Sequence, residues 1–272
     1  MSYLRSFFEE GGPKFGAWKR LPQSRRFIVD FMHFAKRVPS QALTRNFRLG
    51  DMPQLRTSLK SRIGWAAIFL KAYSVMAARH PDLRQVFMKY PWMHLYEHPH
   101  QLARVAVARP YKGNDWIFFQ CISDAHKKSL SEIQAILTAA ATDPVEDIPL
   151  FRLQYVFSML PSFLRRMVWW GVLHISGAIR CGQTGTLGFT TVASSGGISI
   201  HPPSVGNIIL TYGPVDDTGA VRVTLVYDHR VYDGLTIANY LAEFEEVMNQ
   251  QITTELMELQ QKKQPAEPVL EC

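Results

Sequence analysis

Residues 227–234 read Tyr-Asp-His-Arg-Val-Tyr-Asp-Gly and lie between a predicted strand and a predicted helix. Apolar and polar residues alternate from 221 to 225, as in a strand with one buried face. Apolar residues recur at helical spacing from 235 to 249. His229 therefore lies where a strand gives way to a helix. Asp233 comes directly before the helix, where a carboxylate caps free backbone N–H groups.

His229 is a candidate general base. A neutral imidazole held in one tautomer is the side chain best suited to proton transfer near neutral pH. The alternative is a structural histidine at a strand end, followed by an ordinary Asp cap at Asp233. Because a His-x-x-x-Asp-Gly pattern also arises by chance, its place between a strand and a helix is what favours the catalytic interpretation.

Composition indicates a protein with a substantial core. The chain has 272 residues, of which 47% are hydrophobic and 19% charged, enough for one large domain or two small ones. Its three cysteines, Cys121, Cys181 and Cys272, are widely spaced and odd in number. They form no disulfide framework and no Cys-x-x-Cys metal site, so we expect a reducing, cytoplasmic location and no metal.

The net charge of +7 is concentrated near the N-terminus. Residues 1–50 hold ten Lys or Arg against three Asp or Glu, which accounts for the whole excess. We expect a basic arm at 1–21 that meets phosphates, an acidic partner or anionic lipid, or else only a solvated basic face. No nucleic-acid-binding module is recognised, and the longest uncharged apolar run, 167–179, is too short to span a membrane.

Further predicted elements follow from periodicity and from turn residues. Helices are predicted at 25–36, 52–59, 64–78 and 124–137, the last with Ser129 or Ser131 as its cap. Strands are predicted at 42–49, 93–96, 104–108, 116–122, 185–192, 207–212 and 221–228. Residues 255–272 are predicted to be a disordered tail.

Residues 155–179 combine an Arg165-Arg166 pair with a Trp169-Trp170 pair beside an apolar stretch. A membrane-interface contact or a hydrophobic tunnel for an acyl acceptor would suit this composition. A buried helix pair or an oligomer contact suits it better.

The form Asp-His-Arg-Val-x-Asp-Gly at 228–234 resembles the catalytic signature of the dihydrolipoyl acyltransferase and chloramphenicol acetyltransferase superfamily. Residues 122–133 and 185–203 are similar to segments that follow in the same order in that superfamily. The resemblance covers about residues 22–250.

This resemblance implies an α/β two-layer sandwich with a mixed β-sheet, assembled as a homotrimer with active sites between subunits. It implies coenzyme A thioesters as acyl donors, with His229 as general base and Asp233 holding the His229 loop. The superfamily stabilises the oxyanion with a serine hydroxyl, and Thr190 stands at that position. Thr191 or Ser194 are the alternatives for that role.

The predicted organisation is a basic arm at 1–21, an acyltransferase domain at 22–254 and a tail at 255–272. No lipoyl-bearing segment is recognised, so we expect a stand-alone acyltransferase that uses a coenzyme A or carrier-protein thioester and an unidentified acceptor. The alternatives are a dihydrolipoyl acyltransferase core served by lipoyl domains on another chain, and a non-catalytic trimeric scaffold of the same fold.

Overall fold

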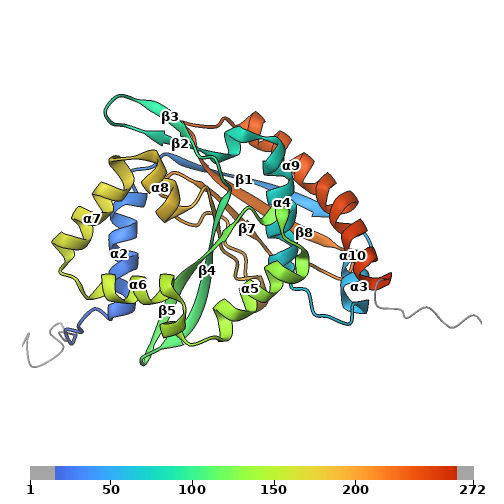
Figure 1. Cartoon of the computed structure of the whole chain (residues 1–272), viewed down its shortest axis with the longest axis horizontal. Coiled ribbons are helices and arrows are strands. Elements are labelled where there is room, and N and C mark those ends of the chain that lie inside the picture. The colour runs from blue at the N-terminus through green and yellow to red at the C-terminus, as the bar shows by residue number, and fades with distance from the viewer. Residues whose placement is uncertain (1–15, 262–272) are drawn as a thin grey trace, which may run out of the picture.

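The computed structural model describes residues 16–261, which form a six-stranded sheet with helices on both faces (Figure 1). The helices are α2 (Gln23–Ala35), α3 (Met52–Ser58), α4 (Trp65–Arg79), α5 (Leu130–Thr142), α6 (Pro149–Met159), α7 (Ser162–His174), α8 (Gly177–Thr184), α9 (Gly234–Val247) and α10 (Thr253–Gln261). The strands are β1 (Ser40–Arg48), β2 (Gln85–Met88), β3 (His94–Glu97), β4 (Leu102–Tyr111), β5 (Asn114–Ser123), β6 (Leu187–Phe189), β7 (Ile208–Tyr212) and β8 (Ala220–Asp228).

The main sheet has the strand order β1-β8-β7-β6-β4-β5. β6 runs parallel to both of its neighbours, β4 and β7, whereas the other pairs are antiparallel. Parallel neighbours need long crossover connections, and the one from β4 to β6 consists of β5 followed by helices α5 to α8. β2 and β3 form a separate hairpin. The predicted fold class, an α/β architecture with a mixed sheet, is confirmed.

One face of the sheet packs against α4, α5 and α9 and forms the largest core. The alternating residues of β8 point into it: Val223 and Leu225 are fully buried there. Phe244 of α9 contacts Phe69 of α4, with ring centroids 6.1 Å apart. This core holds β8 firmly up to Asp228, the residue before His229.

The other face of the sheet is covered by α2, α6, α7 and α8, which gather on one side of the molecule in Figure 1. Phe27 and Phe31 of α2 pack against Trp169 of α7, with ring centroids 5.5 and 6.0 Å apart. Buried Asp30 of α2 also forms an ion pair with Arg165 of α7 at 2.5 Å. The predicted segment 155–179 thus forms helices anchored to α2, with Trp169 buried and Trp170 half-exposed. Among the described residues, no helix is both long and apolar enough to cross a membrane.

The predicted strand at 185–192 is wrong in length, because β6 spans only Leu187–Phe189. The Thr191 hydroxyl donates to the carbonyl oxygen of Tyr212 at 2.9 Å and accepts from the Ala193 N–H at 3.1 Å. A threonine side chain that bonds the backbone in this way ends the ladder of backbone pairs.

The predicted disordered tail at 255–272 is also wrong for its first residues, which belong to α10. Leu256 is fully buried in the main core, and the carboxylate of Glu255 accepts from the backbone N–H of Leu130 at 3.0 Å. These contacts fix the helix to α5. The rest of the predicted tail, 262–272, and residues 1–15 of the predicted arm lie outside the described residues.

Candidate active site

His229 is held in one orientation by two backbone contacts. Its backbone N–H donates to the carbonyl oxygen of Pro39 at 3.1 Å, and its ring Nδ1 lies 3.0 Å from the carbonyl oxygen of Tyr232. Because a carbonyl oxygen only accepts hydrogen bonds, this contact assigns the proton to Nδ1 and leaves the lone pair on Nε2. The side chain of His229 is exposed. It is therefore an accessible imidazole in the tautomer that a general base requires.

An ion pair between buried Asp228 and exposed Arg230 fixes the backbone on either side of His229. The carboxylate of Asp228 is fully buried and accepts from Nε and Nη2 of Arg230, at 2.8 and 2.5 Å. The backbone N–H of Arg230 donates to the same carboxylate at 3.0 Å. A bidentate pair of this kind fixes geometry as well as contributing energy.

Arg180 of α8 lies on the other side of the Asp228 carboxylate. A Cβ placed on Gly206 would lie 2.2 Å from Nη2 of Arg180 and 3.2 Å from Oδ2 of Asp228, so the two side chains flank the same glycine. Burial lowers the pKa of Arg180 to about 10, although the Asp228 charge opposes this shift. Gly206, at φ +105°, leaves the space that both groups need.

Tyr232 fixes the carbonyl that holds the His229 ring. Its buried hydroxyl donates to the carbonyl oxygen of Asp82 at 2.7 Å, and its N–H donates to the carbonyl oxygen of Asp228 at 3.1 Å. Burial raises the pKa of the Tyr232 hydroxyl well above its usual value, so the hydroxyl remains a donor. The carbonyl of Tyr232 is thus positioned from both sides.

Asp233 is the N-cap of α9, as predicted. Its Oδ1 accepts from the backbone N–H of Thr236 at 2.8 Å. Hydrogen bonds from Thr236 lower the pKa of this carboxyl, and the nearby His229 contributes in the same direction. Asp233 therefore fixes the start of the helix that ends the His229 loop.

Three hydroxyls were predicted as alternatives for an oxyanion donor, and the structure separates them. The Thr191 hydroxyl already donates to the backbone at the end of β6. Ser194 lies in an exposed turn. The Thr190 hydroxyl has no hydrogen-bond partner among residues 16–261, so its proton is free to be donated.

Thr190 and His229 do not meet within one subunit. The N–H of Thr190 donates to the carbonyl oxygen of Leu210, and Leu210 is paired with Leu225 on β8. His229 lies four residues beyond Leu225, which is roughly 13 Å along the strand and about 10 Å across two strand spacings. One copy of the chain therefore does not bring the two groups together.

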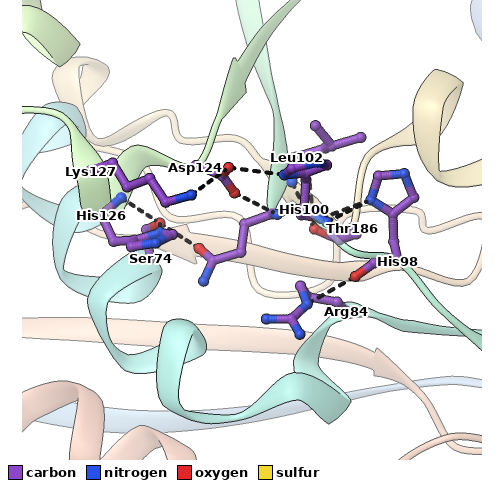
Figure 2. A network of polar contacts seen from close by, with 10 residues as sticks. Ser74, Arg84, His98, His100, Leu102, Asp124, His126, Lys127 and Thr186 are labelled. Atoms are coloured by element: carbon purple, nitrogen blue, oxygen red, sulfur yellow. Dashed lines mark hydrogen bonds and ion pairs between the residues drawn. The ribbon is translucent and has the colours of Figure 1, made fainter.

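A polar network lies at the start of β4 and β6 (Figure 2), and Thr190 directly follows β6. Asp124 accepts from the backbone N–H of Gln101 at 3.0 Å and from Nδ1 of His100 at 3.1 Å. Next to it, the Thr186 hydroxyl accepts from the N–H of Leu102 at 3.0 Å, which ties the start of β6 to β4. Across the described part of the chain, no group of three His, Cys, Asp or Glu residues is placed to hold a metal ion.

An apolar cavity of about 570 Å³ lies between the sheet and helices α2, α6, α7 and α8. Most of its wall is aromatic or aliphatic, and Thr190 belongs to the wall. We call it the apolar cavity. His229 does not line it.

No family model matches the chain, and no curated protein is similar to it in sequence. Solved structures do match over most of its length. A truncated catalytic core of the 2-oxoacid dehydrogenase multienzyme complex from Thermoplasma acidophilum matches with a TM-score of 0.64 and 19% identity, over 86% of this chain and 99% of that one.

A probable dihydrolipoamide acetyltransferase from Listeria monocytogenes has a TM-score of 0.61 at 16% identity and covers 86% of this chain and 95% of its own. The dihydrolipoamide acetyltransferase of Azotobacter vinelandii has the same TM-score and identity, with 89% and 95% covered. The chain has a fold similar to these catalytic cores. The resemblance predicted from the His229 motif is thereby confirmed at the level of the fold.

The sequence alone indicated His229, Asp233 and Thr190 as candidate site residues. They lie after β8, at the start of α9 and after β6, respectively. Sequence reasoning did not assign a role to Asp228 and Arg230, although an acid and an arginine on either side of a histidine are a visible signal. Arg180 has no such signal, because only the packing of α8 against the His229 loop brings it there.

Proposed function

We propose that this protein is an acyltransferase in which His229 is the general base. The observation that carries the proposal is the contact between Nδ1 of His229 and the carbonyl oxygen of Tyr232, which leaves Nε2 free to take a proton. The similar fold of the dihydrolipoamide acetyltransferase cores supports it. One of those structures concerns a serine, a histidine and an asparagine in the catalytic mechanism, with the last two four positions apart. The same spacing separates His229 from Asp233.

The proposed reaction is a transfer from a thioester to a hydroxyl, thiol or amine acceptor. Nε2 of His229 removes the acceptor's proton as the acceptor attacks the thioester carbonyl carbon. The resulting oxyanion accepts a hydrogen bond from Thr190 of a neighbouring subunit. The C–S bond then breaks, and the imidazolium returns its proton to the leaving thiolate. Such a base contributes about 10²–10⁴-fold, and an oxyanion donor about 10²–10³-fold.

The proposed assembly is a homotrimer with the active site between subunits. Its support is the separation of His229 and Thr190 within one subunit, because neither group alone makes a complete site. His229 is exposed, as expected for a residue that faces a neighbour and a substrate.

The proposed donor is a coenzyme A or carrier-protein thioester, and the enzyme acts alone. A second candidate is the catalytic core of a dihydrolipoyl acyltransferase that receives acyl groups from lipoyl domains on another chain. That candidate is favoured by the 95–99% of each catalytic core that this chain matches.

The test measures thiol release from a panel of acyl-coenzyme A donors, with hydroxyl, amine and dihydrolipoamide acceptors offered in parallel. We expect His229→Ala to lose about 10²–10⁴-fold in kcat. The matched control is His94→Ala, because Nδ1 of His94 also lies 2.8 Å from a backbone carbonyl oxygen, that of Trp92, yet His94 is on β3. Preference for dihydrolipoamide favours the second candidate. Equal turnover by the wild type and His229→Ala contradicts the proposal.

A further inference from the structure

The apolar cavity is large and lies between the sheet and the aromatic cluster that joins α2 to α7. Its floor is the outer face of the sheet, including Arg104 and Ala106 of β4, whose neighbours Ala103 and Val105 point into the main core instead. Helices α2, α6, α7 and α8 form its walls. Protein interiors are close-packed, with few voids larger than a water molecule. A volume of about 570 Å³ falls in the range of ligand pockets.

The cavity wall presents accessible apolar surface. Leu153, Val168 and Ile179, from α6, α7 and α8, line it and are 58%, 44% and 48% exposed. Core residues of the same type are almost fully buried. A hydrocarbon group placed here would remove from water the part of this surface that faces the cavity, at about 25 cal/mol per Å².

Two polar groups in the wall have no hydrogen-bond partner, whereas their polar neighbours do. Gln154 donates to the carbonyl oxygen of Ile117 at 2.7 Å, and Asn207 donates to that of Thr184 at 3.1 Å. By contrast, Nε of Arg104 and Nε1 of Trp169 are buried and unpartnered among residues 16–261. Both are N–H groups, which only donate.

Arg104 also lacks a counter-charge. Its residue is 9% exposed, and its Nη2 donates to the carbonyl oxygen of Gly182. Among the described residues, no Asp or Glu lines the cavity and none forms an ion pair with Arg104. A buried charge without a partner is costly, so an anionic group that pairs with the Arg104 guanidinium would be strongly favoured here.

We propose that the apolar cavity binds a single hydrocarbon chain with an anionic oxygen head group, and that Arg104 binds the head group. The hydrocarbon chain lies along the aliphatic and aromatic wall, and the head group pairs with the guanidinium of Arg104. The cavity has nearly four times the volume of the ~150 Å³ cavity that takes up benzene, which suits a chain of roughly 10–20 carbons.

The cavity also reaches the candidate oxyanion donor. Thr190 lines it, and Arg104 is paired with Gly188, two residues before Thr190. A bound chain therefore lies next to the hydroxyl that would face the thioester. That the bound hydrocarbon chain is part of a substrate rests on the proposed function, whereas its binding to the cavity does not.

Binding is tested by isothermal titration calorimetry on the full chain, with no acyl donor present. The probes are straight-chain carboxylates of 4 to 18 carbons, methyl dodecanoate as the neutral counterpart of dodecanoate, and dodecyl phosphate to separate two sources of anionic head group. We expect affinity to rise with chain length up to the limit set by the cavity. The methyl ester should bind at least about tenfold more weakly than dodecanoate.

Two pairs of variants distinguish binding of the hydrocarbon chain from binding of the head group. Ala106→Trp fills the floor of the cavity and should abolish binding, whereas Ala108→Trp, on the same face of β4 but outside the cavity, should not. Arg104→Met should reduce dodecanoate affinity to that of its ester, and Arg104→Lys should retain part of the difference. Circular dichroism and thermal unfolding confirm that each variant is folded.

The proposal is overturned if no chain length binds to the wild type, or if the acid and the ester bind equally. It is also overturned if folded Ala106→Trp binds as tightly as Ala108→Trp. His229→Ala should bind dodecanoate like the wild type. If that variant binds and no donor is ever turned over, the proposed function fails while the cavity's ligand stands.

Discussion

At the scale of single residues, the position of His229 depends on the charge of Asp228. That carboxylate is fully buried between Arg230 and Arg180. Asp228→Asn keeps the shape but removes the charge that pairs with Arg230 and acts on Arg180. Weakening the charge-assisted hydrogen bonds of a partly exposed arginine costs about 1.5 kcal/mol, and a shift of the imidazole by about 1 Å costs up to about 10²-fold in kcat.

Urea unfolding and steady-state kinetics measure both effects of Asp228→Asn. Asp217→Asn, in the exposed turn before β8, is the matched control. Unchanged stability together with unchanged kcat in Asp228→Asn would show that the pair does not position His229.

A second residue-scale prediction concerns pH. Burial lowers the pKa of His174 from its usual 6.5, and the charges of Arg180 and Lys89 add to the shift. Below about pH 6.5 the unfolded chain binds a proton at His174 that the folded chain does not. The contribution of His174 to the free energy of unfolding should therefore be constant above pH 7 and fall as the pH drops below 6.5. Urea unfolding of His174→Gln between pH 7 and 5 should show a shallower fall, and an identical slope would contradict the prediction.

At the scale of elements, the sequence was sufficient to predict a helix where a strong local signal coincided with burial. The long helices α4 and α9 follow from apolar periodicity, and α5 begins at the predicted cap, where Ser129 and Glu132 form a capping box. Ser129 accepts from the Glu132 N–H at 3.2 Å, and the Glu132 carboxylate accepts from the Ser129 N–H at 2.7 Å. These contacts lie within four residues, so a single stretch of sequence contains them.

Sequence reasoning failed for elements that tertiary contacts define. α10 is a polar segment whose order depends on one buried side chain, Leu256, and on a contact between Glu255 and α5. The candidate site divides in the same way. His229 and Asp233 are recognised from one motif, whereas Arg180 and Arg104 reach their places only through the packing of α8 and β4. Nothing in their own neighbourhoods of the sequence indicates those places.

At the scale of the whole molecule, the two groups of the proposed site lie apart within one copy of the chain. His229 lies beyond the end of β8, and Thr190 follows β6, about four residues away in register and two strands across. A cyclic assembly brings the same two surfaces together at every interface. In a trimer, each site would take its base from one subunit and its oxyanion donor from the next.

This arrangement predicts complementation between two inactive variants. His229→Ala lacks the base, and Thr190→Val lacks the hydroxyl while keeping the shape of the side chain. When equal amounts are unfolded and refolded together, random assembly places an intact His229 opposite an intact Thr190 in about a quarter of the sites. We expect about a quarter of wild-type activity, against a loss of about 10²–10³-fold for Thr190→Val alone. Native mass spectrometry counts the mixed trimers. Mixed trimers without recovered activity would place both groups in the same subunit's site, and an active monomer would exclude the shared site altogether.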